Sequence, residues 1–331
     1  MTEQNKQAPS LTDYIATLTL ARDIATERGK NIIDLPDLLM ALALDAGQVG
    51  VTLRSHRAHP RVLASATRAV DNKLLKELGI SAPAPVSLPE LAGYQLTDRA
   101  RRILNQVKTS RELALALAQE SSGYIQEILS EAKIEHSALV TALEQLPSST
   151  SRQVVDTSHQ NRIGASHTVF LPTNPQKAWE FVSNPSNLPN WLPAIESLEV
   201  KPGSTGPWLG RSAAPTGKFS KVPGKPSRQV QEVTLIGKDA ESKRIEYELK
   251  FPHEPQLNTQ QVSVQLTEDS NGCICRLSLV WVRPNSKKIG TLQGLVRKPL
   301  GLIAKPAVRY FVMGQATAIT RNLRQALDKE L

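Results

Sequence analysis

The spacing of apolar residues changes near residue 150. Before this point, apolar residues recur every three or four positions, as they do between Ile15 and Ala25, which is typical of helices with one buried face. After it, apolar and polar residues alternate, first between Ser166 and Leu171, which is typical of half-buried strands. The pattern therefore predicts two domains of different class on one chain.

The domain boundaries follow from the composition between the two patterns. The helical pattern ends at Pro147, which is followed by a run of serine and threonine, and we expect a linker over residues 147–164. A helical domain is predicted over residues 10–146, and a domain of mixed helices and strands over residues 165–331. Each segment is long enough to bury a core of its own.

The helical half contains an internal repeat. The stretch from Pro36 to Leu42 returns 75 positions later as the stretch from Arg111 to Leu117. Residues 82–87, in which alanine and proline alternate up to Pro85, break helix and separate the copies. We therefore predict two copies, over about residues 11–80 and 96–146, packed as a pseudo-twofold bundle with a groove between them that suits a peptide. The spacing in the second copy is shorter and predicts a shortened first helix.

The second half reads as an antiparallel sheet with a long final helix. Asn174 and Pro175 supply a cap and a first-turn proline for a helix over 176–182. The turn signal at 269–272 predicts a hairpin. Strands are expected over residues 166–171, 195–201, 227–237, 242–251, 259–267 and 273–283, and the last helix over about 305–329.

The helical half resembles the double Clp R repeat found at the N-terminus of Clp-type unfoldases. The residues that show the resemblance are Leu11-Thr12, Gly29, the run Leu38–Leu42, the segment Gly123–Leu129 and the segment Ala132–Ile134. The resemblance implies an all-α domain that recruits a protein partner, namely a Clp protease component, an adaptor or a substrate. The chain has no Gly-x-x-x-x-Gly-Lys-Ser/Thr loop to hold a nucleotide phosphate, so it is not expected to be the unfoldase itself.

The same resemblance suggests where a partner would bind. In some family members a glutamate of a Thr-Glu-His-Leu-Leu motif holds phosphoarginine, and the matching positions here are Pro36 and Arg111. Because a guanidinium group is recognised by a carboxylate, phosphoarginine binding is not expected. The polar residues at the motif positions, Asp37, Arg111 and Glu112, are the predicted partner-binding residues.

The second half resembles the SRPBCC superfamily, which includes START, Bet v 1 and polyketide cyclase-like proteins. The residues that show the resemblance are the segment Thr173–Val182 and the bend ending in Asn190–Pro193. The resemblance implies an α+β helix-grip fold, in which an antiparallel sheet wraps around a long C-terminal helix. A cavity between sheet and helix suits a small hydrophobic ligand, and the alternative is a filled core that holds no ligand. The residues expected to line it are Trp191, Val233, Trp281 and Phe311.

The charge is divided unevenly between the halves. The net charge of the chain is +9, and all of the basic excess lies after residue 150. The stretch 286–309 combines apolar residues with a basic surface and contains no acidic residue; its basic residues include Lys287, Lys288, Arg297, Lys298 and Lys305. We interpret it as a lid over the cavity, with a peripheral membrane surface as the alternative. Nucleic acid is disfavoured because no aromatic stacking platform accompanies the charge.

Candidate catalytic chemistry is sparse. Cys273 and Cys275 share one face of a predicted strand and are interpreted as packing residues. Glu246 and Glu248 alternate with apolar neighbours, so an acid/base pair would require their face to be internal. No pattern predicts a cofactor or a metal site. The polar N-terminal residues lack the features of a signal peptide, and a cytoplasmic location is expected.

These observations favour a non-catalytic binding protein with two modules, one for a protein partner and one for a small hydrophobic ligand. One alternative is a cyclase or dehydratase acting on a hydrophobic substrate, which requires a pair of ionisable side chains inside the cavity. The other is a peripheral membrane or lipid-transfer protein that uses residues 286–309.

Overall fold

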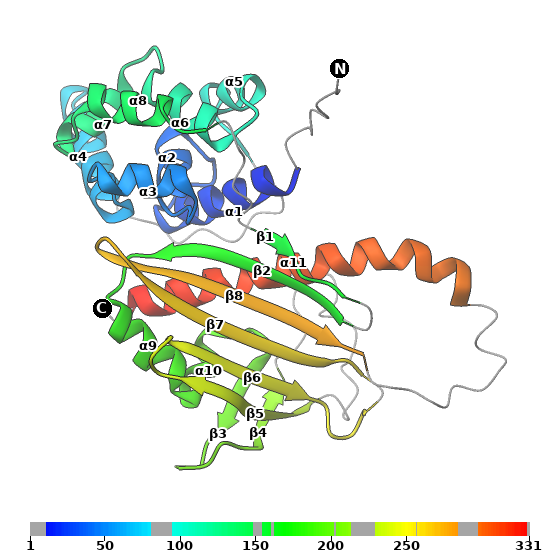
Figure 1. Cartoon of the computed structure of the whole chain (residues 1–331). Coiled ribbons are helices and arrows are strands. Elements are labelled where there is room, and N and C mark those ends of the chain that lie inside the picture. The colour runs from blue at the N-terminus through cyan, green and yellow to red at the C-terminus, as the bar shows by residue number, and fades with distance from the viewer. Residues whose placement is uncertain are drawn as a thin grey trace. The chain divides into compact units, whose positions relative to one another are not determined.

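The computed structural model describes residues 11–80, 95–147, 154–159, 162–201, 203–212, 229–255, 257–283 and 297–329 (Figure 1). The chain divides into two compact units, residues 1–153 and residues 154–331, which are described separately. No helix in the described part of the chain is both long enough and apolar enough to cross a bilayer.

The described residues of the first unit form eight helices. They are α1 (Leu11–Glu27), α2 (Leu35–Ala43), α3 (Gln48–Ser55), α4 (Pro60–Glu77), α5 (Asp98–Gln106), α6 (Ser110–Ala118), α7 (Tyr124–Glu131) and α8 (His136–Glu144). Helix α2 lies at the centre: all of its residues are buried, and it packs against α1, α3, α4 and α6. The hydrophobic run that the sequence places in this helix therefore forms the core of the unit.

The eight helices form two sets of four, α1–α4 and α5–α8. The two middle helices of one set match those of the other in length. Helices α2 and α6 have nine residues each, and α3 and α7 have eight residues each. The outer helices differ, because α1 has 17 residues and α5 has nine, while α4 has 18 and α8 has nine. The second set is therefore the smaller one, with a shortened first helix.

The second unit is built on one antiparallel sheet of eight strands, in the order β1-β2-β8-β7-β6-β5-β4-β3. The strands are β1 (Val154–Asp156), β2 (Arg162–Leu171), β3 (Ile195–Glu199), β4 (Trp208–Ser212), β5 (Val230–Asp239), β6 (Arg244–Lys250), β7 (Thr259–Asp269) and β8 (Gly272–Val282). Helices α9 (Pro175–Ser183) and α10 (Leu188–Trp191) follow β2, with a 3-10 turn at Pro185–Asn187 between them. Helix α11 (Arg297–Lys329) ends the chain.

Helix α11 covers one face of this sheet. It packs along β2 and β8 and also contacts β1 and α10, and it runs behind the sheet in Figure 1. Its buried residues are spaced three or four positions apart and form one stripe: Val312, Ala316, Ile319, Leu323 and Leu327. A sheet that grips a C-terminal helix in this way is the helix-grip fold that the sequence predicted.

Two strands were not predicted from the sequence. Strand β1 lies within the segment expected to be a linker, and β2 begins at Arg162, inside the same segment. Strand β4 has only five residues with a glycine at its centre, so it lacks the long alternating pattern that marks β6 or β7. Both strands owe their pairing to neighbours in the sheet rather than to a strong local pattern.

Helix α11 is joined to β2 by a buried histidine. His167 lies on the helix-facing side of β2 with 1% of its surface exposed, and its Nδ1 is 2.5 Å from Oγ1 of Thr320. The Thr320 hydroxyl has one hydrogen, which points to the backbone carbonyls of Ala316 and Thr317. Nδ1 of His167 must therefore be the donor, which leaves Nε2 as a bare acceptor in the core. Burial lowers the pKa of His167 to about 4.

This depressed pKa predicts a loss of stability in acid. An unfolded histidine titrates near its model value of 6.5, so the stability of the second unit is complete above that pH and falls between pH 6.5 and 4. We expect a loss of about 3 kcal/mol from this residue. Denaturant unfolding followed by tryptophan fluorescence measures it, because all four tryptophans lie in the second unit. The variant His167→Asn should show a shallower loss over this pH range; an unchanged slope would contradict the assignment.

Candidate ligand site and partner surface

The helix-facing side of the sheet contains one row of residues that crosses six strands. Successive Cα pairs join Ile163 to Trp281, Trp281 to Gln260, Gln260 to Leu249, Leu249 to Val233, and Val233 to Trp208. Side chains that are paired in this way point to the same face of a sheet. We call these six residues the inner row. It lies where β8 ends and β7 begins, and His167 follows its member Ile163 by four residues along β2.

An aromatic pair closes one end of the inner row against the helix. The rings of Trp281 and Phe311 meet edge to face, with centroids 5.8 Å apart. Trp281 is partly exposed although it faces the helix side, and 56% of Phe311 is exposed. These large apolar surfaces are therefore accessible to a small molecule at this end of the sheet.

Several polar atoms on this side of the sheet have no hydrogen-bond partner among the residues that the structure describes. The indole Nε1 atoms of Trp208 and Trp281 are donors without acceptors, and Oε1 of Gln231 is an acceptor without a donor. On α11, Oε1 of Gln315 is also unpartnered, and this residue follows Phe311 by one helical turn. Buried polar atoms of folded proteins are nearly always paired, so these atoms make this side of the sheet a candidate ligand site.

The four predicted cavity residues are only partly brought together. Val233 and Trp281 belong to the inner row, and Phe311 contacts Trp281. Trp191 lies at the end of α10 and is completely buried, also with an unpartnered indole nitrogen. Sequence reasoning did not select Trp208, Gln231 or Gln315. A sequence signal for such residues would be a polar or amphipathic residue at an inward position of the alternating pattern. This signal can be used only once the internal face of the sheet is known.

Tyr247 and His167, two buried ionisable residues on this face, are far apart. Tyr247 donates a hydrogen bond of 3.0 Å to the carbonyl of Val182, and burial raises its pKa. His167 lies on β2, and the strands β8 and β7 stand between it and β6. Three strand spacings correspond to about 14 Å, too far for one proton-transfer step. Tyr247 and His167 therefore do not form an acid/base pair with each other.

The remaining candidate groups of the second unit are structural. Burial raises the pKa of both Cys273 and Cys275, which are free and buried on the inner face, consistent with packing. Glu248 lies on the outer face and is ion-paired with Lys250 there. Hydrogen bonds from Lys250 and from Gln261 lower its pKa even though partial burial opposes this. Glu246 lies on the same outer face and pairs with Arg244. The two glutamates therefore do not face the helix.

Most side chains of the predicted basic stretch, residues 286–309, are not among those that the structure describes. Lys287 and Lys288 lie outside the described residues. Arg297, Lys298 and Lys305 fall in the first part of α11, where only the backbone is described. The choice between a lid and a membrane surface stays a prediction for this stretch.

In the helical unit, Asp37 is part of a buried polar network rather than of a surface. It is fully buried, and its carboxylate accepts from Arg28 at 2.6 Å and from the backbone N–H of Asp34 at 2.9 Å. Burial raises the pKa of Asp37 more than the Arg28 guanidinium lowers it. Asp37 caps α2 and holds Arg28 in place, so a partner cannot reach its side chain. The prediction that it binds a partner is corrected on this point.

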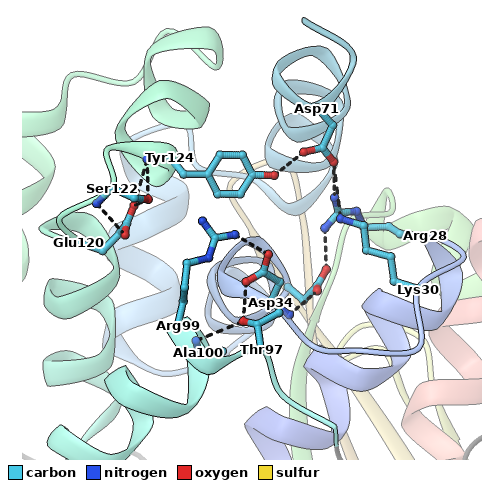
Figure 2. Close-up of polar contacts among 11 residues, drawn as sticks. Arg28, Lys30, Asp34, Asp71, Thr97, Arg99, Ala100, Glu120, Ser122 and Tyr124 are labelled. Atoms are coloured by element: carbon cyan, nitrogen blue, oxygen red, sulfur yellow. Dashed lines mark hydrogen bonds and ion pairs between the residues drawn. The ribbon is translucent and has the colours of Figure 1, made fainter. Parts of the chain in front are cut away.

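The network continues from the first set of helices to the second (Figure 2). The second nitrogen of Arg28 binds Asp71 at 3.1 Å, and Asp71 accepts a hydrogen bond from the hydroxyl of Tyr124 at the start of α7. Burial and the Asp71 carboxylate raise the pKa of Tyr124. The guanidinium of Arg99 lies 5.1 Å from the centre of the Tyr124 ring and binds Asp34 at 2.8 Å. A closed ring of contacts therefore ties the two sets together.

Arg111 and Glu112 also have structural roles. Nε of Arg111 donates to the carbonyl of Leu143 at 3.0 Å, and one of its terminal nitrogens donates to the carbonyl of Glu144 at 2.6 Å. Glu112 accepts from the backbone N–H of Lys108 at 2.6 Å, in front of α6. Asp37 and Glu112 thus occupy equivalent positions in α2 and α6 and perform the same capping function.

A hollow of about 540 Å³ lies between the two sets of helices. Its lining comes from the start of α3 in the first set, and from the start of α6 and the segment after α8 in the second. Most lining residues are small or apolar; they are Ala46, Gly47, Gln48, Val49, Val51, Thr52, Ser110, Leu146 and Pro147. Val51 is 44% exposed. This groove is an accessible surface between the two sets of helices.

No group of three or more potential metal ligands gathers within the described ranges. The side chains that line the inner row and the hollow are apolar or uncharged. The residues described at both places therefore suit an uncharged ligand or a peptide better than a metal ion.

Comparison with known protein families identifies the family to which the second unit is similar. A family model described as polyketide cyclase / dehydrase and lipid transport matches residues 162–328. The chain belongs to this family. No family model matches the helical unit as a Clp R repeat. Among curated proteins, none matches the chain.

Solved structures are similar to half of the chain. The Zhui aromatase/cyclase from Streptomyces sp. R1128 is 16% identical, with 51% of this chain and 96% of that chain covered and a TM-score of 0.35. The protein XoxI from Bacillus cereus is 11% identical, with 50% and 94% covered and a TM-score of 0.32. Ara h 8.0201 is 14% identical, with 46% and 99% covered and a TM-score of 0.28.

The buried network of the helical unit predicts an asymmetry between two aspartates. Asp37→Asn keeps the shape of the side chain but removes the charge that faces Arg28, and breaking such a buried pair should cost about 3 kcal/mol. Asp98→Asn removes an ion pair with Arg101 in which the aspartate is 89% exposed, so stability should not change measurably. Unfolding of both variants is measured by circular dichroism at the helical band. Equal stabilities would contradict the role given to Asp37.

Proposed function

We propose that this chain is a binding protein with two modules. The helix-grip unit holds a small hydrophobic ligand between the sheet and α11, against the inner row and Phe311. The helical unit binds a protein partner. The ligand proposal depends mainly on one observation: accessible aromatic surface and unpartnered polar atoms occur together on the helix-facing side of the sheet.

Family membership and chemistry support the ligand proposal together. Members of a family described by cyclisation, dehydration and lipid transport act on or carry molecules with large apolar surfaces. Here Trp281 and Phe311 supply such a surface, and Val233 and Leu249 continue it along the inner row. Trp191, buried at the end of α10, completes the set of residues that we assign to the site. Tyr247 and His167 are too far apart to act as an acid/base pair, which favours binding over catalysis.

The ligand proposal predicts a difference between two exposed apolar residues. The whole chain is titrated with N-phenyl-1-naphthylamine, a neutral fluorescent probe, and should bind it at one site. Phe311→Ala should weaken binding roughly ten-fold, since a buried aromatic contact contributes on the order of 1–2 kcal/mol. Leu209→Ala is the matched control: Leu209 is 55% exposed but alternates with Trp208 and so points to the other face of the sheet.

Two results would contradict this prediction. One is a loss of affinity in Leu209→Ala as large as that in Phe311→Ala, which would indicate non-specific surface binding. The other is failure of the probe to bind the unmodified chain. Mass spectrometry of the purified chain after denaturation adds an independent measurement, because a retained hydrophobic molecule should be released from the folded protein.

For the helical unit, we propose a Clp R-like module whose partner is a Clp protease component, an adaptor or a substrate of that system. Two sets of four helices with matched central lengths support a duplicated bundle. The hollow between the sets supplies an accessible, largely apolar groove in which an extended peptide segment of the partner would lie. The buried network behind it keeps the two sets together, so the groove is preformed.

Co-precipitation with the whole chain tests this proposal. We expect a Clp component or a known Clp substrate among the captured proteins. Val51→Glu places a charge in the groove and should abolish that capture, whereas Val62→Glu, at a residue 37% exposed on α4 outside the groove, should leave it unchanged. The proposal fails if no Clp component or substrate is captured, or if Val51→Glu captures it as well as the unmodified chain does.

A further inference from the structure

The outer face of the sheet, opposite to α11, carries a second hollow, with a volume of about 270 Å³. This face is turned toward the viewer in Figure 1. The hollow lies over β2, β8, β7 and β6 and is bordered by the segment that follows β1. We call it the outer basin; its polar lining includes Arg162, Arg244, Glu246, Gln261, Ser263 and Ser278.

Small side chains form the floor of the basin and long side chains form its walls. Ser263 of β7 is paired directly with Ser278 of β8, so their hydroxyl groups lie next to each other on the outer face. Arg162 and His159 stand on the β2 side of this floor, and Glu246 stands on the β6 side. Both serines are half-buried, and no described residue hydrogen-bonds to either side chain. The floor therefore offers two hydroxyl donors to a small molecule.

The lining of the basin has a positive excess. The carboxylate of Glu246 is ion-paired with Arg244, so these two charges compensate each other. Arg162 is exposed, and one of its terminal nitrogens donates to the uncharged amide oxygen of Gln261. It has no carboxylate partner among the residues that the structure describes. The charge of Arg162 is therefore available to an anion in the basin.

A second arginine of this kind lies beside the floor. Arg276 precedes Ser278 by two residues on β8, so both side chains are on the outer face. Its Nε donates to Oγ of Ser166 at 3.2 Å, and Ser166 is paired directly with Ser278. No ion pair joins Arg276 to a carboxylate in the described ranges. Arg276 is paired with Thr168 and Arg162 begins β2, so the row of Ser166 and the floor lies between the two arginines.

These donors complement an anion with several oxygen atoms. A guanidinium group presents a planar fork of N–H groups that fits a phosphate or a carboxylate, and a serine hydroxyl adds a single donor. A carboxylate has two oxygens, whereas a phosphate group has three terminal oxygens and a larger charge, which suits donors on two sides and on the floor. The basin is smaller than the roughly 300–1,000 Å³ of sites for drug-sized ligands, so it suits one compact group.

We propose that the outer basin binds a phosphate group, held between Arg162 and Arg276 with the hydroxyls of Ser263 and Ser278 beneath it. The site lies on the opposite face of the sheet from the inner row. It is therefore separate from the site of the hydrophobic ligand and does not depend on it.

Titration calorimetry of the whole chain tests this proposal with inorganic phosphate and with acetate at constant ionic strength. We expect phosphate to bind at one site, roughly ten-fold more tightly than acetate, because it engages more of the donors. Arg162→Gln and Arg276→Gln should each weaken phosphate binding roughly ten-fold, since each removes a charge-assisted hydrogen bond. Ser278→Val should weaken it as well, because valine fills the floor and does not donate, while it suits a strand.

Arg211→Gln is the matched control for the loss of charge. Arg211 lies on β4, which β5 separates from the basin, its side chain is 69% exposed, and it is ion-paired with Glu196. Its replacement should leave the affinity for phosphate unchanged. Thermal unfolding shows whether each variant is folded, and the two arginine variants decide the matter if Ser278→Val does not fold.

A soluble phosphate monoester and a lipid headgroup both carry the recognised group. Glycerol 3-phosphate and vesicles that contain phosphatidic acid distinguish these sources, by calorimetry and by flotation. Binding of either one should be weakened by Arg162→Gln and not by Arg211→Gln.

Three results would overturn the phosphate site. They are failure of inorganic phosphate to bind the unmodified chain, equal affinities for phosphate and acetate, and a loss in Arg211→Gln as large as that in Arg162→Gln. None of them bears on the proposed function, because the affinity of N-phenyl-1-naphthylamine for the inner face is measured separately and should be the same in Arg162→Gln as in the unmodified chain.

Discussion

The second unit depends on the alternation of side chains along its strands, combined with an antiparallel register that is regular across the inner row. In β6, Ile245, Tyr247 and Leu249 are buried toward the helix, while Glu246 and Glu248 form ion pairs on the other face. A shift of one residue would exchange the two faces, which fixes the register wherever one face is buried. The register in turn places residues from six strands in one row, and the proposed ligand site is a property of that row.

The two units treat their buried polar groups differently. In the helical unit, Arg28, Asp34, Asp71 and Tyr124 are each engaged in hydrogen bonds or ion pairs, and the ring that they form joins the two sets of helices (Figure 2). On the inner face of the sheet, polar atoms of tryptophan and glutamine have no described partner. A satisfied network stabilises a structure, whereas buried polar atoms without a partner carry a free-energy cost. Asp37 therefore belongs to the fold, and Trp208 is a residue of the proposed site.

The sequence predicted the elements that have strong local patterns. The helix-grip order was predictable because β6 to β8 alternate cleanly and α11 has a long apolar stripe. Val233, Trp281 and Phe311 were predicted as cavity residues on the same grounds, and the structure places Val233 and Trp281 in the inner row and Phe311 against Trp281. Strands β1 and β4 were missed because short strands depend on their neighbours. Asp37 was misassigned because a capping carboxylate and a binding carboxylate look the same in sequence; only burial separates them. Gln231 was missed because the inward set of β5 cannot be chosen without the register.

The indole N–H signals of the four tryptophans test the central claim most directly, since each gives one cross-peak in a nitrogen–proton correlation spectrum of the whole chain. On addition of N-phenyl-1-naphthylamine, the signals of Trp208 and Trp281 should shift, because both lie on the inner row, while the signal of Trp179 should stay in place. If Trp179 shifts as much as Trp208, or if the probe binds and neither inner-row signal moves, the ligand does not lie between the sheet and α11.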